Sequence, residues 1–162
     1  MWCKLTWALH YLFMIKEFSL KRDGNLKLSE HFIVKEFACK DGSDKVLIDI
    51  DLVNKLEIIR QYFNRPTTIL SGYRTEEYNA KVSNTKESQH CKGTAADIKI
   101  DGVSPIAVAL YAEYVLLKDT GGIGLYKGQA FTHVDVREKK TRWVQHGNSS
   151  TYRVVNKICL NI

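Results

Sequence analysis

Proline is scarce in this chain of 162 residues, and features that mark several protein classes are missing from it. Only Pro66 and Pro105 occur, so the chain has no proline-rich linker that would separate two domains. It has no low-complexity segment and no internal repeat, which excludes solenoids and propellers. With 44% hydrophobic and 26% charged residues, the composition is that of an ordinary globular protein. The length therefore predicts one domain with one core.

Long basic runs are also missing, although the formal net charge is +6. No stretch of five or more Lys and Arg occurs, and no basic helix carries interleaved aromatic residues. We therefore expect no nucleic-acid partner. The positive charge fits either an ordinary basic soluble protein or a protein attracted to a polyanion such as an anionic cell wall.

The four cysteines, Cys3, Cys39, Cys91 and Cys159, form no CxxC pair. A structural zinc knuckle is thereby excluded, and the scattered spacing is unlike a disulfide framework. We interpret the cysteines as mostly reduced thiols.

The N-terminal segment has no clear assignment. Residues 5–15 are mostly apolar and follow Lys4, as in a signal peptide, but Thr6 and His10 interrupt them and no small-x-small cleavage site follows. The apolar stretch is too short to cross a bilayer as a helix, so we expect no transmembrane segment. We favour a disordered or packed N-terminal extension over residues 1–27 and place the domain at residues 28–162.

The apolar spacing and the capping residues predict helices early in the chain and strands late in it. This order indicates an α+β fold: a single domain in which helices pack on a mainly antiparallel sheet. The expected elements are a helical turn capped by Ser29, a helix over 51–63, a strand over 67–70, a helix over 76–82, a strand over 95–100, a helix from Ser104–Pro105 to about 117, strands over 123–126 and 131–136, and an edge strand within 152–162.

Three potential metal ligands lie near predicted strands. His90 precedes the strand over 95–100, Asp97 lies on the polar face of that strand, and His133 lies on a later strand. Two imidazoles and one carboxylate leave a position on tetrahedral zinc open for water, which is the ligand count of a catalytic site. Zinc would acidify that water and polarise a carbonyl. The spacing alone is unspecific, because an exposed loop histidine and a strand-edge carboxylate give the same pattern.

Three motifs resemble, in the same order, those of the zinc D-alanyl-D-alanine carboxypeptidase family. Residues 71–74 (SGYR) resemble its S-G-Y-R segment, and residues 88–97 (SQHCKGTAAD) resemble its S-x-H-x-x-G-x-A-x-D signature. Residues 131–137 (FTHVDVR) resemble its later H-x-D strand. The resemblance extends over about residues 28–143 and leaves both termini outside.

The resemblance implies a hedgehog-like, D-Ala-D-Ala-peptidase-like fold and a substrate in bacterial peptidoglycan. It implies that His90, Asp97 and His133 bind Zn2+, and that Arg74 binds the substrate or stabilises the oxyanion. Arg74 follows a glycine turn, so its guanidinium could reach across the cleft to a carboxylate or a developing oxyanion.

The sequence departs from the family pattern at the general base. Many members carry a carboxylate three residues before the last histidine ligand, where this chain has Ala130. Lys127 occupies another position where a base could lie. Asp135 is the nearest carboxylate and shares a strand face with His133, so it would either activate the water or orient a ligand histidine.

Two further residues are candidates for substrate binding, each with a purely structural alternative. Ser88 would support the metal loop, or it would be an ordinary turn residue. Trp143 would stack on the substrate, or it would be a buried aromatic residue.

Two functions agree with these residues. The first is a zinc metallopeptidase, a D,D-carboxypeptidase or an endopeptidase of the endolysin kind, with Arg74 and Asp135 as catalytic residues. It would act as a monomer on peptidoglycan peptide stems in the cell wall, either exported or released at lysis. The alternative is a zinc-containing cell-wall-binding module without turnover, which the missing upstream carboxylate permits.

Overall fold

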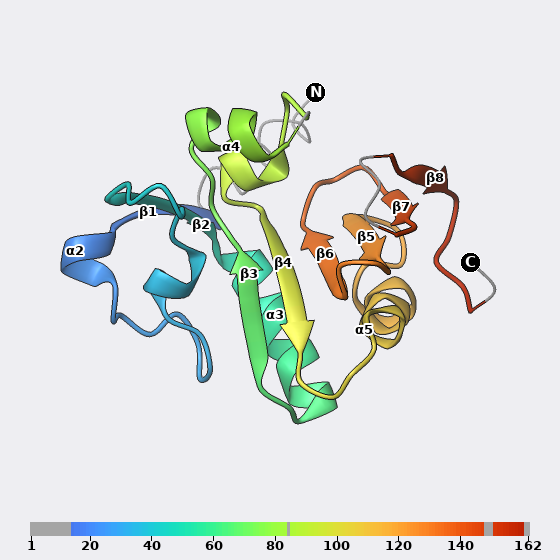
Figure 1. The fold of residues 1–162 in the computed structure, drawn as a ribbon. Coiled ribbons are helices and arrows are strands. Elements are labelled where there is room, and N and C mark those ends of the chain that lie inside the picture. Colours follow the sequence, from blue (N-terminus) through green and yellow to red (C-terminus); the bar gives the residue numbers. More distant parts are fainter. Residues whose placement is uncertain (1–13, 84, 148–150, 161–162) are drawn as a thin grey trace, which may run out of the picture.

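A six-stranded sheet forms the centre of the computed structural model, which describes residues 14–83, 85–147 and 151–160 (Figure 1). The strand order is β3-β4-β6-β5-β7-β8. All neighbouring strands pair antiparallel except β5 and β7, which are parallel. The predicted single α+β domain with a mainly antiparallel sheet is therefore confirmed. The strands are β3 (Thr67–Ser71), β4 (Ala95–Ile100), β5 (Gly122–Tyr126), β6 (Phe131–Asp135), β7 (Thr141–Gln145) and β8 (Arg153–Val155).

One face of this sheet is apolar and forms the core with the helices α3 (Ile50–Phe63) and α5 (Pro105–Tyr111). The predicted alternation of β4 is confirmed, because Ala96, Ile98 and Ile100 belong to the core and Asp97 points to the other face. Figure 1 shows α3 behind β3 and β4. The opposite face of the sheet is left for polar residues.

Side-chain caps explain where the helices begin. The predicted helix after Thr75 is confirmed as α4 (Glu76–Val82), and the Thr75 hydroxyl accepts a hydrogen bond from the backbone N–H of Tyr78. The Ser104 hydroxyl likewise accepts from Ala107 N–H at the start of α5. Beyond α5 the chain continues as a π-helical turn, η3 (Ala112–Leu116), so the predicted helix to about residue 117 is confirmed with a change of winding.

The prediction of a helical turn capped by Ser29 is wrong. The Ser29 hydroxyl donates to Glu57 Oε2 on α3 at 2.6 Å instead of capping a helix. The helical turn begins later, as η1 (Val34–Phe37), where Glu36 Oε2 accepts from Ile33 N–H.

Three strands were not anticipated from the sequence. β1 (Ile15–Ser19) pairs antiparallel with β2 (Lys45–Asp49) in a separate two-stranded sheet, and the short helix α2 (Leu20–Asp23) follows β1. β7 extends the main sheet. The C-terminal edge strand is confirmed as β8, and residues 161–162 of its predicted range lie outside the described residues.

The predicted N-terminal extension is only partly within the described residues, because residues 1–13, with Cys3, lie outside them. From Ile15 onward the chain pairs with β2, and Phe18 and Leu20 pack against the core. The boundary between residues 27 and 28 stays a prediction, but the segment just before it contacts the domain.

Two smaller expectations concern the membrane and the thiols. No helix in the described part of the chain is long and apolar enough to cross a membrane. The cysteines within that part, Cys39, Cys91 and Cys159, are free thiols, as expected.

We predict that removing residues 1–21 lowers the melting temperature by about 5–10 °C relative to removing residues 1–13. Only the longer truncation deletes β1 and the core contacts of Phe18 and Leu20, a loss of about 2–3 kcal/mol of apolar burial. Thermal unfolding followed by circular dichroism gives the comparison. Equal melting temperatures of the two truncated chains would contradict a stabilising role of β1.

Candidate metal centre

The pairing of β4 with β6 places two of the predicted ligands side by side. Asp97 and His133 are directly opposite each other in this antiparallel pair, on the face turned away from the core. His90 comes from the short helical turn η2 (Gln89–Lys92), which ends at Gly93 in a left-handed conformation with φ of 74°. Ser88 begins this turn, and its hydroxyl accepts a hydrogen bond from His90 N–H at 3.3 Å. Ser88 therefore supports the loop that presents His90.

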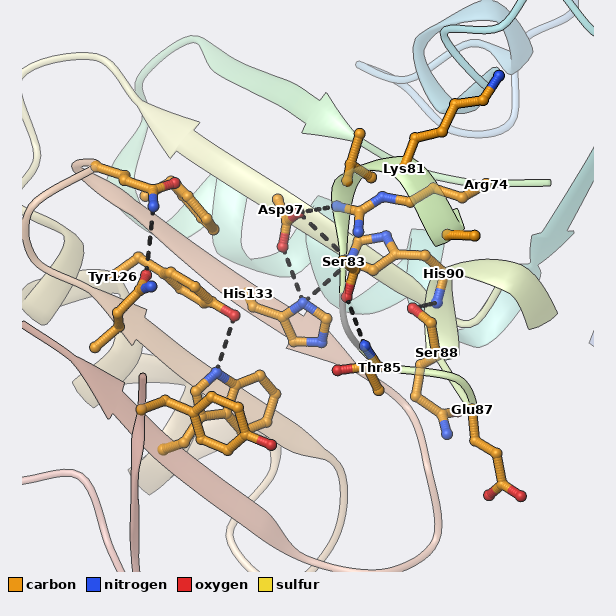
Figure 2. A pocket seen from close by; sticks show the side chains of 18 of the residues that line it. Arg74, Lys81, Ser83, Thr85, Glu87, Ser88, His90, Asp97, Tyr126 and His133 are labelled. Atoms are coloured by element: carbon orange, nitrogen blue, oxygen red, sulfur yellow. Dashed lines mark hydrogen bonds and ion pairs between the residues drawn. The ribbon is translucent and has the colours of Figure 1, made fainter. Parts of the chain in front are cut away.

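The three side chains converge on one point (Figure 2). His90 Nε2 lies 3.2 Å from His133 Nδ1, and His133 Nδ1 lies 2.9 Å from Asp97 Oδ1. His90 Nε2 lies 3.4 Å from Asp97 Oδ2. All three residues are buried, and their ligand atoms lie within 4.8 Å of one another. This set offers two imidazole nitrogens and one carboxylate to a single cation.

The second nitrogen of each histidine shows that the set fits a metal. His90 Nδ1 lies 2.7 Å from the carbonyl oxygen of Gly72, and His133 Nε2 lies 3.0 Å from Asp135 Oδ2. These oxygens can only accept, so they hold the ring protons on the outer nitrogens. The converging nitrogens then present their lone pairs, which is the usual arrangement of metal-binding histidines.

The charges of the cluster also favour a cation. Burial alone would lower the pKa of His133, but hydrogen bonds to Asp135 and Asp97 outweigh it and raise the pKa to about 9. Burial opposes the charge of Asp97 as well, yet the neighbouring histidines hold its pKa well below the usual range. The pKa of His90 is lowered, mainly by burial. The ionised carboxylates of Asp97 and Asp135 thus stabilise positive charge on His133. A metal cation that binds His133 Nδ1 would displace the proton from that nitrogen.

Arg74 lies beside the cluster, at the start of the loop that follows β3. Its Nη2 donates to Asp97 Oδ2 at 2.7 Å, and its Nε donates to Ser71 Oγ at 2.8 Å. The turn before it requires glycine, because a Cβ at Gly72 would lie 2.6 Å from the Cα of Phe37. The structure therefore places Arg74 at the site, directly on the carboxylate of a predicted ligand.

Asp135 lies on the far side of His133 from the cluster and is fully buried. Its carboxylate accepts from Gly122 N–H at 2.9 Å and from Arg137 Nη2 at 2.5 Å, in addition to its contact with His133. Burial alone would raise its pKa, but these hydrogen bonds from His133 and Arg137 hold the pKa well below the usual range. Since Asp135 does not line the cleft, this geometry favours the role of orienting His133 over activation of water.

Alternating glycines on β5 make room for these side chains. A Cβ at Gly122 would overlap the Asp135 carboxylate, and a Cβ at Gly124 would overlap the ring of Trp143. Both glycines lie on the polar face of the sheet, opposite Asp135 and His133 respectively. In the sequence, the G-x-G-x-Y pattern of residues 122–126 is the signal for this packing, and it lies outside the three motifs that indicated the site.

An open cleft of about 580 Å³ gives access to the cluster. Trp143 forms one wall: its ring centroid lies 4.9 Å from that of His133, and 9% of the residue is exposed. Its Nε1–H donates to Tyr126 Oη at 3.1 Å, and Arg137 Cζ lies 5.7 Å from the ring centroid. Trp143 thus packs against a predicted ligand while it borders the cleft. Tyr126 and Arg137 are cleft residues that the sequence analysis missed.

The chain matches the family model described as Peptidase M15 over residues 27–135, which is more than half of its length. The chain therefore belongs to the Peptidase M15 family, whose members are metallopeptidases. The predicted resemblance is confirmed, and the His–Asp–His group could hold a metal.

Two relatives carry the name of one enzyme. The chain is 33% identical over 76 residues to the peptidoglycan L,D-endopeptidase MepK of Escherichia coli strain K12, covering 44% of this chain and 40% of that protein. It is 35% identical over 83 residues to the probable peptidoglycan L,D-endopeptidase MepK of Haemophilus influenzae, covering 48% and 43%. The chain thus spans less than half the length of the curated relatives that it matches.

A second group of ligand-type side chains lies elsewhere and provides a control. Glu30, His31 and Glu57 also bring ligand atoms together, but Glu30 and His31 are exposed. Glu57 is already engaged, because it accepts from the Ser29 hydroxyl and lies 2.6 Å from His31 Nδ1.

We predict that the protein binds about one zinc ion per chain and that His90→Ala, Asp97→Ala and His133→Ala each weaken binding strongly, because a three-ligand site has no spare donor. Elemental analysis after dialysis against zinc measures the stoichiometry. His31→Ala is the matched control and should keep the full zinc content. If the control loses zinc and the three variants retain it, the metal site is instead the group of Glu30, His31 and Glu57.

We predict that Asp135→Asn weakens zinc binding by about ten- to a hundredfold, because His133 loses the carboxylate that orients it. Competition with a chromogenic chelator measures the affinity, and excess zinc should restore part of the activity. Glu138→Gln, which neutralises an exposed carboxylate three residues along the chain, should leave the affinity unchanged. Parental zinc affinity together with lost turnover would assign Asp135 to the base instead.

Proposed function

We propose that this chain is a zinc metallopeptidase that hydrolyses peptide bonds in the peptide stems of bacterial peptidoglycan. The observation that carries the proposal is the buried His90–Asp97–His133 group at the floor of an open cleft, in a chain of the Peptidase M15 family. The names of the curated relatives supply the substrate class.

His90 Nε2, Asp97 and His133 Nδ1 would hold the zinc ion. Bound there, zinc supplies the Lewis acidity that activates water and polarises the scissile carbonyl. The rest of the chemistry falls to the side chains around the ligands. Gly72 and Asp135 keep the two imidazoles in the ligating tautomer and orientation.

Arg74 is proposed to bind the substrate or the developing oxyanion. Two of its donors are already fixed, by Asp97 and by Ser71, so the guanidinium is held in one orientation before the substrate arrives. Such preorganisation lets the remaining N–H groups of Arg74 stabilise charge without reorganising during the reaction.

The charge of the cleft suits an acidic peptide. Arg74, Lys81 and Arg137 line it, against the carboxylates of Glu87 and the proposed ligand Asp97. Arg137 is paired with the buried Asp135, and its guanidinium also lies over the Trp143 ring. Because Asp97 and Asp135 offset the charges of Arg74 and Arg137, the cleft would become cationic when zinc is bound, and it would then attract peptides that carry free carboxylates. The net charge of +6 would help to retain the protein on an anionic wall.

An endopeptidase is the form of the activity that we favour. The cleft is lined by residues 80–83, 85 and 87–90 and, across from them, by residues of β5, β6 and β7, so it is bounded along two walls (Figure 2). A groove between two walls suits a substrate that extends on both sides of the scissile bond. The curated relatives named above are called L,D-endopeptidases.

A cell-wall-binding module with zinc but without turnover is the second candidate. One observation favours it: Asp135, the nearest carboxylate in sequence, is turned away from the cleft and engaged by Arg137. A site without a free base near the metal would bind stems and release them uncut.

We predict that the zinc-loaded protein cuts purified peptidoglycan, that a chelator abolishes cutting, and that added zinc restores it. Mass spectrometry of the soluble products reports the activity and the scissile bond together, with Asp97→Ala as the inactive control. Cut stems identify an endopeptidase, and free D-alanine identifies a carboxypeptidase. Sedimentation of the intact protein with uncut wall would favour the binding module, whereas neither binding nor cutting would overturn both candidates.

A further inference from the structure

Few side chains in the cleft are placed to share a proton with a substrate. Apart from the proposed ligands and the arginines, the titratable residues that line it are Lys81, Glu87, Tyr126 and Tyr152. Figure 2 shows the charged ends of Lys81 and Glu87 pointing away from His133, whereas the ring of Tyr126 points toward it. Tyr152 is 58% exposed. The hydroxyl of Tyr126 is therefore the one group of this set that is directed at the cluster.

The ring of Tyr126 is fixed by its neighbours. Tyr126 is the last residue of β5 and pairs with Phe131 at the start of β6. Their rings are stacked, with centroids 4.2 Å apart and an angle of 16° between the planes. Such packing holds the phenol in place, so a substrate would not have to order it.

The hydrogen bond from Trp143 decides what the phenol can do. Trp143 Nε1–H donates to Tyr126 Oη at 3.1 Å. An indole nitrogen can only donate, so this bond uses a lone pair of the phenol oxygen and leaves the phenol proton for an acceptor in the cleft. Burial raises the pKa of Tyr126 by more than this hydrogen bond lowers it, so the oxygen keeps its proton at neutral pH.

We infer that the Tyr126 hydroxyl donates a hydrogen bond to the carbonyl oxygen of the scissile peptide as negative charge develops on that oxygen. The inference rests on the proposed peptidase function and makes Tyr126 a catalytic residue of it. The phenol keeps its proton throughout, so the step consists of a hydrogen bond that strengthens in the transition state. This role adds a hydrogen-bond donor on the side of the cluster opposite to Arg74 (Figure 2).

The test is Tyr126→Phe, which keeps the ring and its stacking on Phe131 and removes only the hydroxyl. With the zinc-loaded protein and a purified cross-linked stem peptide, we expect kcat to fall by about a hundredfold, with KM within about twofold of the parent. Zinc content and melting temperature should stay at the parental values. Tyr114→Phe removes an exposed phenol on η3 and is the matched control.

Binding provides a readout that needs no turnover. A phosphinate analogue of the stem dipeptide carries anionic oxygens on a tetrahedral phosphorus, and so imitates the oxyanion. By calorimetry, Tyr126→Phe should bind this phosphinate about a hundredfold more weakly and bind the cleaved product peptide as the parent does.

The outcomes separate this inference from the proposed function. If the parent cuts the peptide and Tyr126→Phe cuts it equally fast with equal phosphinate affinity, the inference is wrong and the proposed function stands. A slower variant that has also lost zinc or melting temperature would show that the hydroxyl is structural, which likewise overturns the inference. If the zinc-loaded parent neither cuts the peptide nor binds the phosphinate, the proposed function fails and the inference fails with it.

Discussion

Asp97 and His133 face each other across the antiparallel pair β4–β6, and the whole site depends on this register. Side chains alternate along a strand, so a slip by one residue would turn either ligand into the apolar core. The register is fixed on the other face, where Ile98 and Val134 pack in the core. The same alternation places Asp135 behind His133, and Gly122 and Gly124 beside them. Apolar packing on one face thus sets the polar geometry on the other.

Burying so many ionisable groups is unfavourable unless each is paired. Arg74 pairs with Asp97, Arg137 pairs with Asp135, and each pair lies against one side of the histidine cluster. The charges offset one another within the domain, which leaves the two converging histidine nitrogens available. Zinc would therefore bind to ligands that the fold has already positioned.

A third buried pair supports the site from the core side of the sheet. Arg142 on β7 pairs with Glu113 on η3 and donates to the carbonyl oxygen of Gly121 at 2.6 Å. The next residue, Gly122, donates its N–H to Asp135. Arg142 therefore fixes the backbone at the start of β5, and the next backbone N–H along the chain fixes Asp135. Through Asp135, the buried ion pair in the core helps to orient His133.

Local patterns were sufficient for much of the fold. The apolar spacing of α3, the alternation of β4, and the caps Thr75 and Ser104 are local signals, and each of these predictions is confirmed. β2 was missed because its apolar residues 46–48 run directly into the helix. β7 was missed because Arg142 occupies a core-facing position, which is stable only with Glu113, 29 residues away in sequence.

The candidate site likewise has a part that the sequence predicts and a part that only the fold reveals. Motif order singled out the three ligand candidates, whose convergence requires only β4, β6 and one turn. The role of Asp135 could not be decided from the sequence, because only the fold brings Gly122 to it and turns it away from the cleft. Tyr126 was missed because its partner Trp143 becomes its neighbour only through the parallel pairing of β5 with β7.

Anomalous diffraction at the zinc edge, from crystals of the zinc-supplemented protein, shows whether His90, Asp97 and His133 hold the metal. We expect one strong peak at about 2.0–2.2 Å from His90 Nε2, His133 Nδ1 and an Asp97 carboxylate oxygen, facing the cleft. A peak at Glu30, His31 and Glu57, a peak at a cysteine sulfur, or no peak at the cluster would contradict it.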